Sequence, residues 1–471
     1  MVVRKEKGGK KALQLQAIFS PRSMAVIGVS AVNDRHPATI IYRKNVHRYP
    51  IRVYAVNPKG GAILEEPIYK DISSIPETPD LAVIAVRAEA VPGVLADCIR
   101  THVKGAIVVS GGFAETGRHD LQDEITALCS DAGFPVVGPN CLGVYVPNYL
   151  DTFFLPSERI VKPHTGNVAV VSQSGGILVD LMIKFYDEGV GLSRAMSIGN
   201  KAVIGEVDLL RHFARDTDTK VIAFYIEGFK KNEGREFVLA AGRCGKPVVV
   251  LKSGKSDAGA KAVSSHTASL AGEYASFSAA LAQHGIVEAA NELELVSFCE
   301  ALSAYQKPIS GAVGIVTGSG GHGALAVDAC VRRGLALPSP DEEAIQRIRG
   351  GLSASVGAIA SIRNPADLTG SAVDEDFVVT VEAFCAMKEI DCVIVLLLPY
   401  VPGITADLGS RLSITGKASG KALIAYVPHV DKYRMLIEGF ELNGIPVSPS
   451  IEGAVAMASA LRKLVQCQAK R

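Results

Sequence analysis

The sequence lacks tryptophan, and aromatic residues make up only 6% of its 471 positions. Proteins that bind single-stranded nucleic acid without sequence preference stack bases on aromatic side chains, so this composition disfavours that class. A net charge is also missing, because 49 lysines and arginines face 48 aspartates and glutamates. Such a chain has no global field to attract nucleic acid or an anionic membrane, so we expect neither as a partner.

Paired cysteines, long apolar runs and a secretory signal are missing as well. The nine cysteines are scattered without a CxxC pair, which argues against zinc ribbons and disulfide frameworks, and we predict no metal site. No apolar run reaches 18 residues, so no membrane span is predicted. The opening MVVRKEKGGKKALQLQ is charged and has no apolar h-region. We expect a cytoplasmic protein.

Buried-type strands and helix-period stretches alternate along the chain. LAVIAV, GAIVVS, KVIAFYI and CVIVLLL are continuous apolar runs, whereas HDLQDEITALCSDA and GALAVDACVRRG repeat their apolar residues at helical spacing. This alternation predicts an α/β protein with doubly wound parallel sheets, whose ligands bind at the carboxyl ends of the strands. The length suggests roughly three domains of about 150 residues.

Three segments share one plan, in which an apolar strand runs into a turn of small residues. They are MAVIGVS from Met24, VAVVSQSGG from Val168 and VGIVTGSGGHG from Val313. The second and third modules resemble each other further on. KPVVVLKSG is matched by KALIAYVPH, and HGIVEAANELELVSFCEAL is matched by NGIPVSPSIEGAVAMASAL. We interpret them as two copies of one α/β unit.

The second module holds about 16 more residues than the third between these matched segments. The stretch SGKSDAGAKAVSSHTASLAG covers the excess and carries His266. A lone histidine is usually a surface or core residue with satisfied hydrogen bonds. A loop of small residues, however, can approach a phosphate site closely. A nucleophilic imidazole also needs an acid to hold its second N–H, and Glu227, at the end of a buried strand, is the candidate.

Other turns could hold anions. Ser174, Gly175 and Gly176 follow a strand at a helix start, where free N–H groups and the helix dipole favour phosphate, although a plain tight turn is the commoner explanation of SGG alone. Around Gly28 the GxGxxG fingerprint is broken, so an NAD-dependent dehydrogenase is weakly supported. Lys59 in NPKGG offers a cation for a nucleotide phosphate. Cys141 in GPNCLG could be a nucleophile, but inert packing is the commoner role of such a cysteine.

Five motifs together resemble the α subunit, or α-like part, of the NDP-forming acyl-CoA synthetases, relatives of succinyl-CoA synthetase. They are GPNCLG, VVSQSGG, YIEG, SSHTASLAG and NPADLTG, in this order. The resemblance covers about residues 13–465. It implies a CoA-binding Rossmann-like domain over 13–148 and two flavodoxin-like domains. The first of these spans 158–305 and carries the phosphohistidine loop, and the second spans 308–465.

The resemblance also implies a reaction, in which acyl-CoA, phosphate and ADP are converted reversibly into acid, CoA and ATP. Phosphate would attack the thioester, and the acyl phosphate formed would pass its phosphoryl group to a histidine. The histidine loop would then carry the group to Mg-ADP in an ATP-grasp module. No such module is recognised here, so we expect a separate ATP-grasp β subunit in an α2β2 heterotetramer. The other substrate would be a small organic acid.

Residue roles follow from the matched motifs. His266 corresponds to the phosphohistidine and Glu227 to the acid that steadies it. The phosphate cradle corresponds to Gln173, Ser174, Gly175 and Gly176. The CoA contacts correspond to Gly28, Val29, Ser30, Lys59, Val86, Ser110, Gly111 and Gly112, with Asn140 and Cys141 near the thiol end. A catalytically silent CoA-binding regulatory or scaffold protein is the alternative, although the complete set of motifs argues against it.

Overall fold

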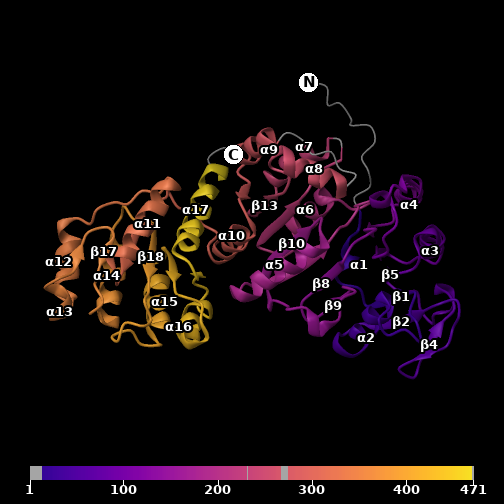
Figure 1. Cartoon of the computed structure of the whole chain (residues 1–471), viewed down its shortest axis with the longest axis horizontal. Coiled ribbons are helices and arrows are strands. Elements are labelled where there is room, and N and C mark those ends of the chain that lie inside the picture. The colour runs from indigo at the N-terminus through magenta and orange to yellow at the C-terminus, as the bar shows by residue number, and fades with distance from the viewer. Residues whose placement is uncertain (1–12, 231, 267–273, 469–471) are drawn as a thin grey trace. The chain divides into compact units, whose positions relative to one another are not determined.

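The structure is a computed structural model that describes residues 13–230, 232–266 and 274–468 (Figure 1). Its contacts divide the chain into two compact units. The first comprises residues up to 186 together with 191–280, and the second comprises residues 187–190 and those from 281 onward. The predicted boundaries between three domains stay a prediction, because contacts alone do not separate the two sheets of the first unit.

The first sheet has the strand order β3-β4-β2-β1-β5-β6-β7, and most of its strands run parallel. Every residue of the central strands β1, β5 and β6 is buried, as their continuous apolar sequences predict. The strands are β1 (Ser23–Ile27), β2 (Arg52–Val56), β3 (Ala62–Ile63), β4 (Glu66–Tyr69), β5 (Leu81–Ile84), β6 (Gly105–Val108) and β7 (Val136–Val137). The helices are α1 (Gln16–Phe19), α2 (Pro37–Arg48), α3 (Val91–Arg100) and α4 (His119–Ala132).

The second sheet of this unit has the order β13-β12-β10-β11-β8-β9. Its parallel core β13-β12-β10-β11 is extended by β8 and β9, which run antiparallel. The strands are β8 (Gly143–Val146), β9 (Leu150–Asp151), β10 (Thr165–Ser172), β11 (Leu192–Ser197), β12 (Val221–Ile226) and β13 (Val248–Lys252). The helices are α5 (Gly175–Asp187), α6 (Glu206–Arg215), α7 (Glu233–Ala241), α8 (Asp257–His266) and α9 (Tyr274–Gln283).

The second unit contains a sheet of order β16-β17-β15-β18-β19-β20, parallel except for β16. Its strands are β14 (Val287–Ala289), which lies outside this sheet, β15 (Val313–Thr317), β16 (Ser361–Ile362), β17 (Ala366–Asp367), β18 (Cys392–Leu396), β19 (Ala422–Tyr426) and β20 (Val447–Ser448). Its helices are α10 (Glu292–Ala304), α11 (Gly320–Arg332), α12 (Glu342–Gly351), α13 (Ala354–Gly357), α14 (Asp374–Ala386), α15 (Leu408–Ser419), α16 (Arg434–Glu441) and α17 (Ile451–Gln468).

The two repeated modules differ by one helix. Between β13 and β14 the chain forms α8 and α9, whereas between β19 and β20 it forms α16 as its only α-helix, every residue of that stretch being described. The sequence excess predicted from the repeat therefore coincides with α8, which ends on His266.

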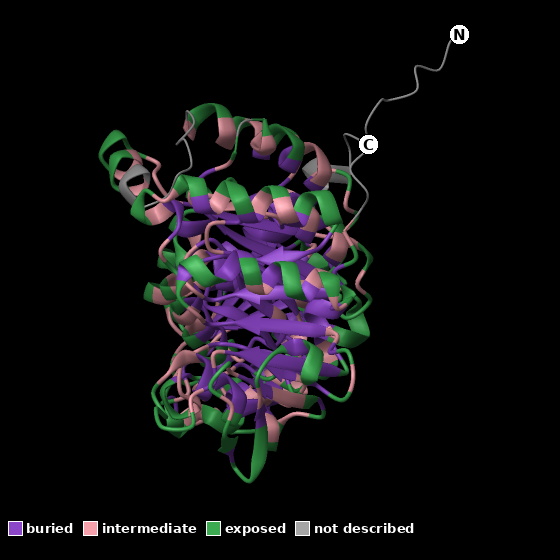
Figure 2. Ribbon diagram, turned by 90° about the vertical axis from the view of Figure 1, so that its right-hand side faces the viewer, coloured by how far each residue is buried: buried purple, intermediate pink, exposed green. Residues whose placement is uncertain are grey.

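Burial follows the layers of an α/β fold. In Figure 2 the strands carry the buried colour almost throughout, while the helices expose their outer faces. The predicted α/β class with doubly wound, mainly parallel sheets is confirmed. Among the described residues, no helix combines the length and the hydropathy that a bilayer crossing requires.

Candidate functional site

A cavity of about 650 Å³ opens at the carboxyl ends of β10 and β12 and at the turn after β7. It brings together sequence positions that lie far apart, as expected where parallel strands end along one edge. Seven predicted site residues line it: Asn140, Cys141, Gln173, Ser174, Gly175, Gly176 and Glu227. The remaining lining residues are Val109, Leu142, Phe154, Leu155, Val179, Gly199 and Asn200.

One end of the cavity is the N-terminus of α5. The Ser172 hydroxyl donates to the carbonyl of Ser174 at 2.6 Å and accepts the Ser174 N–H at 3.1 Å, which fixes the turn between β10 and α5. The first-turn N–H groups of a helix have no acceptor within the helix, and the helix dipole favours an anion there. The same pair of hydrogen bonds recurs in the second unit. There the Thr317 hydroxyl donates to the Ser319 carbonyl and accepts the Ser319 N–H before α11.

Glu227 follows β12, and Gln173 holds its backbone. The Gln173 Oε1 atom accepts the N–H of Glu227 at 2.6 Å and that of Gly228 at 3.0 Å. The Nε2 atom of Gln173 donates to the Gly228 carbonyl at 2.7 Å and to a carboxylate oxygen of Glu206. Both amide atoms of Gln173, predicted as part of the phosphate cradle, are thus engaged by protein groups. The side chain fixes the backbone that carries the candidate acid.

A buried ion pair supports this arrangement, and the sequence analysis did not anticipate it. Lys201 Nζ donates to both carboxylate oxygens of Glu206, at 2.8 and 3.0 Å, and to the Gly228 carbonyl at 2.9 Å. The Glu206 side chain is fully buried and that of Lys201 is 4% exposed. Burial raises the pKa of Glu206, and the Lys201 ammonium opposes that rise. The only signal in the sequence was two ions in the stretch GNKAVIGE.

Asn140 and Cys141 line the cavity from the turn after β7. Asn140 has a φ of 56°, and its N–H donates to the Ser110 carbonyl at 2.8 Å. The Cys141 side chain is buried and donates from Sγ to the Val108 carbonyl at 3.3 Å. Burial raises the pKa of this thiol to about 12, so it is protonated at neutral pH and unsuited to act as a nucleophile. The packing role considered for Cys141 fits this geometry.

The predicted CoA contacts after β1 and β2 lie in neighbouring turns. Gly28 has a φ of 105°, and a Cβ there would lie 2.3 Å from the Ala85 carbonyl oxygen, so glycine is required. The N–H groups of Gly28 and Val29 donate to the Val56 carbonyl at 2.8 and 3.3 Å. Ser30 accepts the N–H of Asn33 at 3.0 Å and closes the loop before α2. Lys59 is exposed in the turn after β2.

The contacts predicted after β5 and β6 are tied to one another. The Ser110 hydroxyl donates to the Val86 carbonyl at 2.6 Å and accepts the Val86 N–H at 3.1 Å. Gly112 has a φ of 101°, and its N–H donates to Glu115 Oε1 at 2.6 Å. A Cβ at Gly111 would lie 3.3 Å from Asn140 Oδ1. These turns therefore connect the edge of the first sheet to the cavity.

The predicted phosphohistidine is only partly described. His266 is the last residue of α8, and its backbone is described. Its side chain and residues 267–273 lie outside the described part of the chain. Of the predicted site, the structure thus describes the residues of the predicted phosphate cradle, Glu227 and the turns predicted to contact CoA. The pairing of Glu227 with the imidazole stays a prediction.

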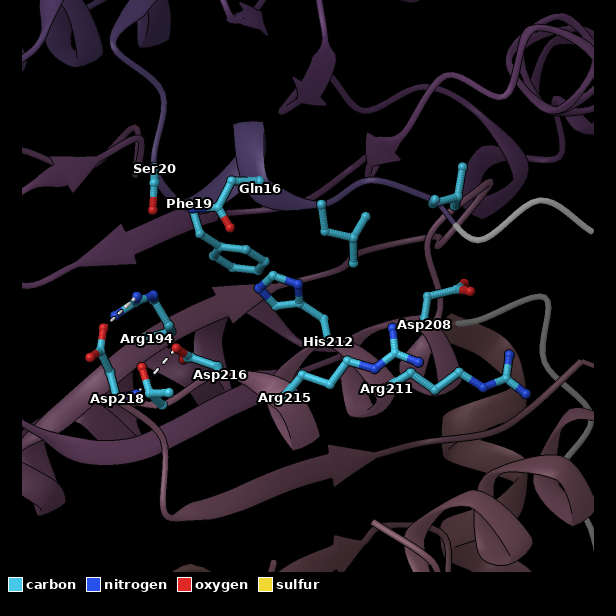
Figure 3. A pocket seen from close by; sticks show the side chains of 13 residues that line it. Gln16, Phe19, Ser20, Arg194, Asp208, Arg211, His212, Arg215, Asp216 and Asp218 are labelled. Atoms are coloured by element: carbon cyan, nitrogen blue, oxygen red, sulfur yellow. Dashed lines mark hydrogen bonds and ion pairs between the residues drawn. The ribbon is translucent and has the colours of Figure 1, made fainter. Parts of the chain in front are cut away.

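A second cavity, of about 520 Å³, lies at the amino-terminal ends of β11 and β12 (Figure 3). Phe19 and His212 stack there with ring centroids 4.9 Å apart. Two of its arginines are paired, Arg194 with Asp218 at 3.1 Å and Arg211 with Glu236 at 2.7 Å. The lining residues that the structure describes include none of the predicted site residues. The candidate site is therefore the cavity at the carboxyl edge.

Comparison with protein-family models gives two matches. Residues 22–147 match a CoA binding domain, and residues 165–302 match the succinyl-CoA ligase like flavodoxin domain. The first range contains the turns after β1, β2, β5 and β6. The second contains the β10–α5 turn, Glu227 and α8.

Several named relatives match along most of this chain. It is 34% identical over 469 residues to the acetate–CoA ligase (ADP-forming) I subunit alpha of Pyrococcus furiosus, covering 97% of this chain and 99% of the relative. It is 38% identical over 391 residues to the acetate–CoA ligase (ADP-forming) I of Archaeoglobus fulgidus, covering 82% of this chain and 55% of the relative. The chain thus spans about half the length of some relatives and nearly all of others.

A solved structure agrees with these matches. The dinucleotide-forming acetyl-coenzyme A synthetase 1 of Ca. Korarchaeum cryptofilum, in complex with phosphate and ADP, superposes with a TM-score of 0.87 at 30% sequence identity. The match covers 97% of this chain and 98% of the solved one.

Proposed function

The chain belongs to the ADP-forming acyl-CoA ligases, and from that membership we propose that it is the α-type chain of such an enzyme. The reaction is acyl-CoA plus phosphate plus ADP giving acid, CoA and ATP, in either direction. The observation that carries the proposal is the single cavity lined by a helix N-terminus, by Glu227 and by the Asn140–Cys141 turn. Phosphate, the Glu227 carboxylate and the thioester of acyl-CoA can come together there.

In the first step, phosphate bound at the α5 N-terminus attacks the thioester carbonyl carbon. A phosphate oxygen forms the new O–C bond, the C–S bond breaks, and CoA leaves as the thiolate, which takes up a proton. The product is an acyl phosphate. The N–H groups of Gly175 and Gly176 and the α5 dipole neutralise the phosphate charge throughout, so the main contributions of the protein are positioning and electrostatics.

In the second step, an imidazole nitrogen of His266 attacks the phosphorus of the acyl phosphate. The N–P bond forms, the P–O bond to the acyl group breaks, and the acid leaves as its carboxylate. Glu227 holds the second ring N–H and stabilises the positive charge of the phosphohistidine. The backbone of Glu227 is held in place by Gln173, whose Oε1 atom accepts the Glu227 N–H at 2.6 Å. CoA itself is held along the edge of the first sheet by the turns from Gly28 to Gly112.

The phosphoryl group then passes to Mg-ADP on an ATP-grasp β subunit. Relatives named as alpha subunits support a separate partner chain. We propose an α2β2 heterotetramer in the cytoplasm, with this chain contributing the CoA site and the phosphohistidine.

The first two steps need only this chain, which gives a direct test. The purified chain is incubated with acetyl-CoA, phenylacetyl-CoA or 3-methylbutanoyl-CoA and ³²P-labelled phosphate, and the label on protein is measured. We expect an acid-labile phosphohistidine at His266 with at least one of these substrates. The variant His266→Asn should bind CoA as the wild type does but should take up no label. The variant His284→Asn, at a histidine of the same module outside α8, should label normally.

Absence of label from the wild-type chain with every acyl-CoA would overturn the proposal and favour the silent CoA-binding alternative. Label that persists in His266→Asn would overturn the assignment of the histidine alone. Net ATP formation from Mg-ADP should appear only after the ATP-grasp subunit is added.

A further inference from the structure

The candidate cavity has an apolar side that the phosphate and thiol chemistry does not use. In the proposed mechanism phosphate binds at the α5 N-terminus and the thiol end of CoA lies near Asn140 and Cys141, all of which line the cavity. Five of the other lining residues are aliphatic or aromatic, and they stand beside the polar Gln173, Asn200 and Glu227: Val109, Leu142, Phe154, Leu155 and Val179. Phe154 and Leu155 are adjacent and half-buried, and they follow β9 on a segment without regular secondary structure. Such a segment needs support from elsewhere to keep a fixed wall.

That support comes from α2 in the CoA-binding domain. Lys44 Nζ donates to Asp151 Oδ1 at 2.8 Å, to the Leu155 carbonyl at 3.2 Å and to the Phe153 carbonyl. One ammonium group thus holds the carbonyls on both sides of Phe154. The Lys44 side chain is 3% exposed, so these hydrogen bonds lie in the protein interior. A buried ammonium or carbonyl without a partner there would cost folding free energy.

The start of the same segment is fixed by a second residue of α2. Asn45 Nδ2 donates to the Asp151 carbonyl at 2.7 Å, and Asn45 Oδ1 accepts the Asp151 N–H at 3.1 Å. Lys162 Nζ lies 2.5 Å from Asp151 Oδ2 as an ion pair, without hydrogen-bond alignment. Residues 151–155 are therefore clamped to α2 along their length, and Phe154 projects from a rigid support.

The proposed reaction geometry gives a role to the part of the cavity lined by Phe154 and Leu155, here called the wall. The acyl carbon must lie between the phosphate and the thiol, so the rest of the acyl group has to extend into the apolar side of the cavity. Among the described lining residues Glu227 carries the only formal charge, and there is no cation. A second carboxylate on the acid would be desolvated without a partner there. An uncharged apolar tail would instead be stabilised in proportion to the apolar surface that it buries.

We propose that Phe154 and Leu155 are the residues that set the size of the acyl group, and that Lys44 positions them. This inference rests on the proposed function, because it assigns the acid to the same cavity. Removing the Phe154 ring enlarges the apolar side without touching the anion cradle, Glu227 or the CoA turns. The expected effect is therefore on selectivity between acids and not on the chemistry common to all of them.

The test compares Phe154→Ala and Phe154→Leu with the wild-type chain in complex with its ATP-grasp subunit. Phosphate-dependent release of CoA is measured with acetyl-CoA, 3-methylbutanoyl-CoA and phenylacetyl-CoA. We expect Phe154→Ala to raise kcat/KM for phenylacetyl-CoA relative to acetyl-CoA by about tenfold or more, since pocket contacts of this size discriminate by about 10- to 200-fold. Phe154→Leu should shift the same ratio by less. Tyr186→Ala, at an exposed aromatic residue of α5, should leave it unchanged.

Lys44→Gln tests the positioning role separately. If Lys44 fixes the wall, this variant should change the selectivity ratio while its dissociation constant for CoA stays at the wild-type value. A uniform loss of kcat on all three substrates would indicate a merely structural role and overturn that part. An unchanged ratio in both Phe154 variants, with an active wild type, would overturn the selectivity wall and leave the proposed function standing. A wild type inactive on every acyl-CoA would count against the proposed function instead.

Discussion

The side-chain oxygen of Gln173 accepts the backbone N–H of Glu227 at 2.6 Å, so a residue at the start of the anion turn holds the candidate acid at the end of a neighbouring strand. Two strands of one sheet, β10 and β12, are thereby coupled at their carboxyl ends by a single amide. In the proposed mechanism these two strand ends position phosphate and the imidazole, and the Gln173 amide fixes the separation of the two strand ends.

Replacing Gln173 by alanine should impair phosphoryl transfer while CoA affinity is retained. The variant leaves the N–H groups of Glu227 and Gly228 unpaired, each at about 1–3 kcal/mol, and frees the backbone of the acid. We expect the rate of ³²P labelling to fall about 10- to 100-fold. Gln346→Ala, at an exposed glutamine of α12, is the control, and equal labelling rates in the two variants would contradict the coupling.

The charge of Glu227 should matter more than its shape. Glu227→Gln keeps the size of the side chain and removes the charge that we propose stabilises the phosphohistidine, so labelling should slow by about 10²-fold or more. Rapid-quench measurements of phosphoprotein formation would show the slower labelling. Wild-type rates in this variant would remove Glu227 from the mechanism.

Gly28 should be irreplaceable, whereas another glycine of the same domain should not. Gly28→Ala would place a Cβ 2.3 Å from the Ala85 carbonyl oxygen at a φ of 105°, so both stability and CoA binding should fall. Gly93 lies on α3, where an added Cβ meets nothing within 4 Å. Gly93→Ala should therefore stabilise the chain by about 0.5–1 kcal/mol. Thermal unfolding and CoA titration of the two variants make the comparison, and similar results for both would be inconsistent with the structure.

Cys141 should behave as packing. Burial raises the pKa of its thiol to about 12, so at pH 7.5 it should resist iodoacetamide, while the partly exposed Cys244 should react first. Mass spectrometry after timed alkylation measures both sites. Cys141→Ala should keep labelling of His266 within about fivefold of the wild type, and complete inactivity would restore the cysteine as a nucleophile.

Lys44 should make stability depend on pH. Burial lowers its pKa from the ordinary 10.5 to about 8, opposed by Asp151, so between these values the unfolded chain binds more protons than the folded one. Stability contributed by this group therefore rises with pH. From pH 7 to 9 the wild type should gain about 1 kcal/mol relative to Lys44→Met. Urea unfolding of both proteins at the two pH values tests the sign, and a relative loss would contradict the assignment.

The sequence predicted those parts of the protein that local rules determine. Continuous apolar runs predicted strands such as β5 and β12, and the turn of small residues after β10 predicted the helix start at Gly175. The comparison of repeats located the extra segment, because an insertion is visible as excess length. The sequence predicted a loop there, whereas Asp257–His266 forms α8.

The supports of the site were missed because they depend on pairing across the fold. Lys201 and Glu206 are unremarkable ions until β11, α6 and the end of β12 meet around Gln173. Lys44 is likewise one cation on an amphipathic helix, and its partners lie more than 100 residues away. No periodicity or motif encodes such contacts.

The Ser172 hydroxyl before α5 and the Thr317 hydroxyl before α11 make the same pair of hydrogen bonds to the residue two positions later. This likeness bears on how the two modules evolved. If the two modules arose by duplication of one ancestral segment, both copies inherited a turn already suited to an anion. The copy that contains α5 differs from the other by α8, which ends on His266, and by Glu227 after β12. The other copy keeps the turn, so a new specificity could evolve there through side-chain changes on α11 alone.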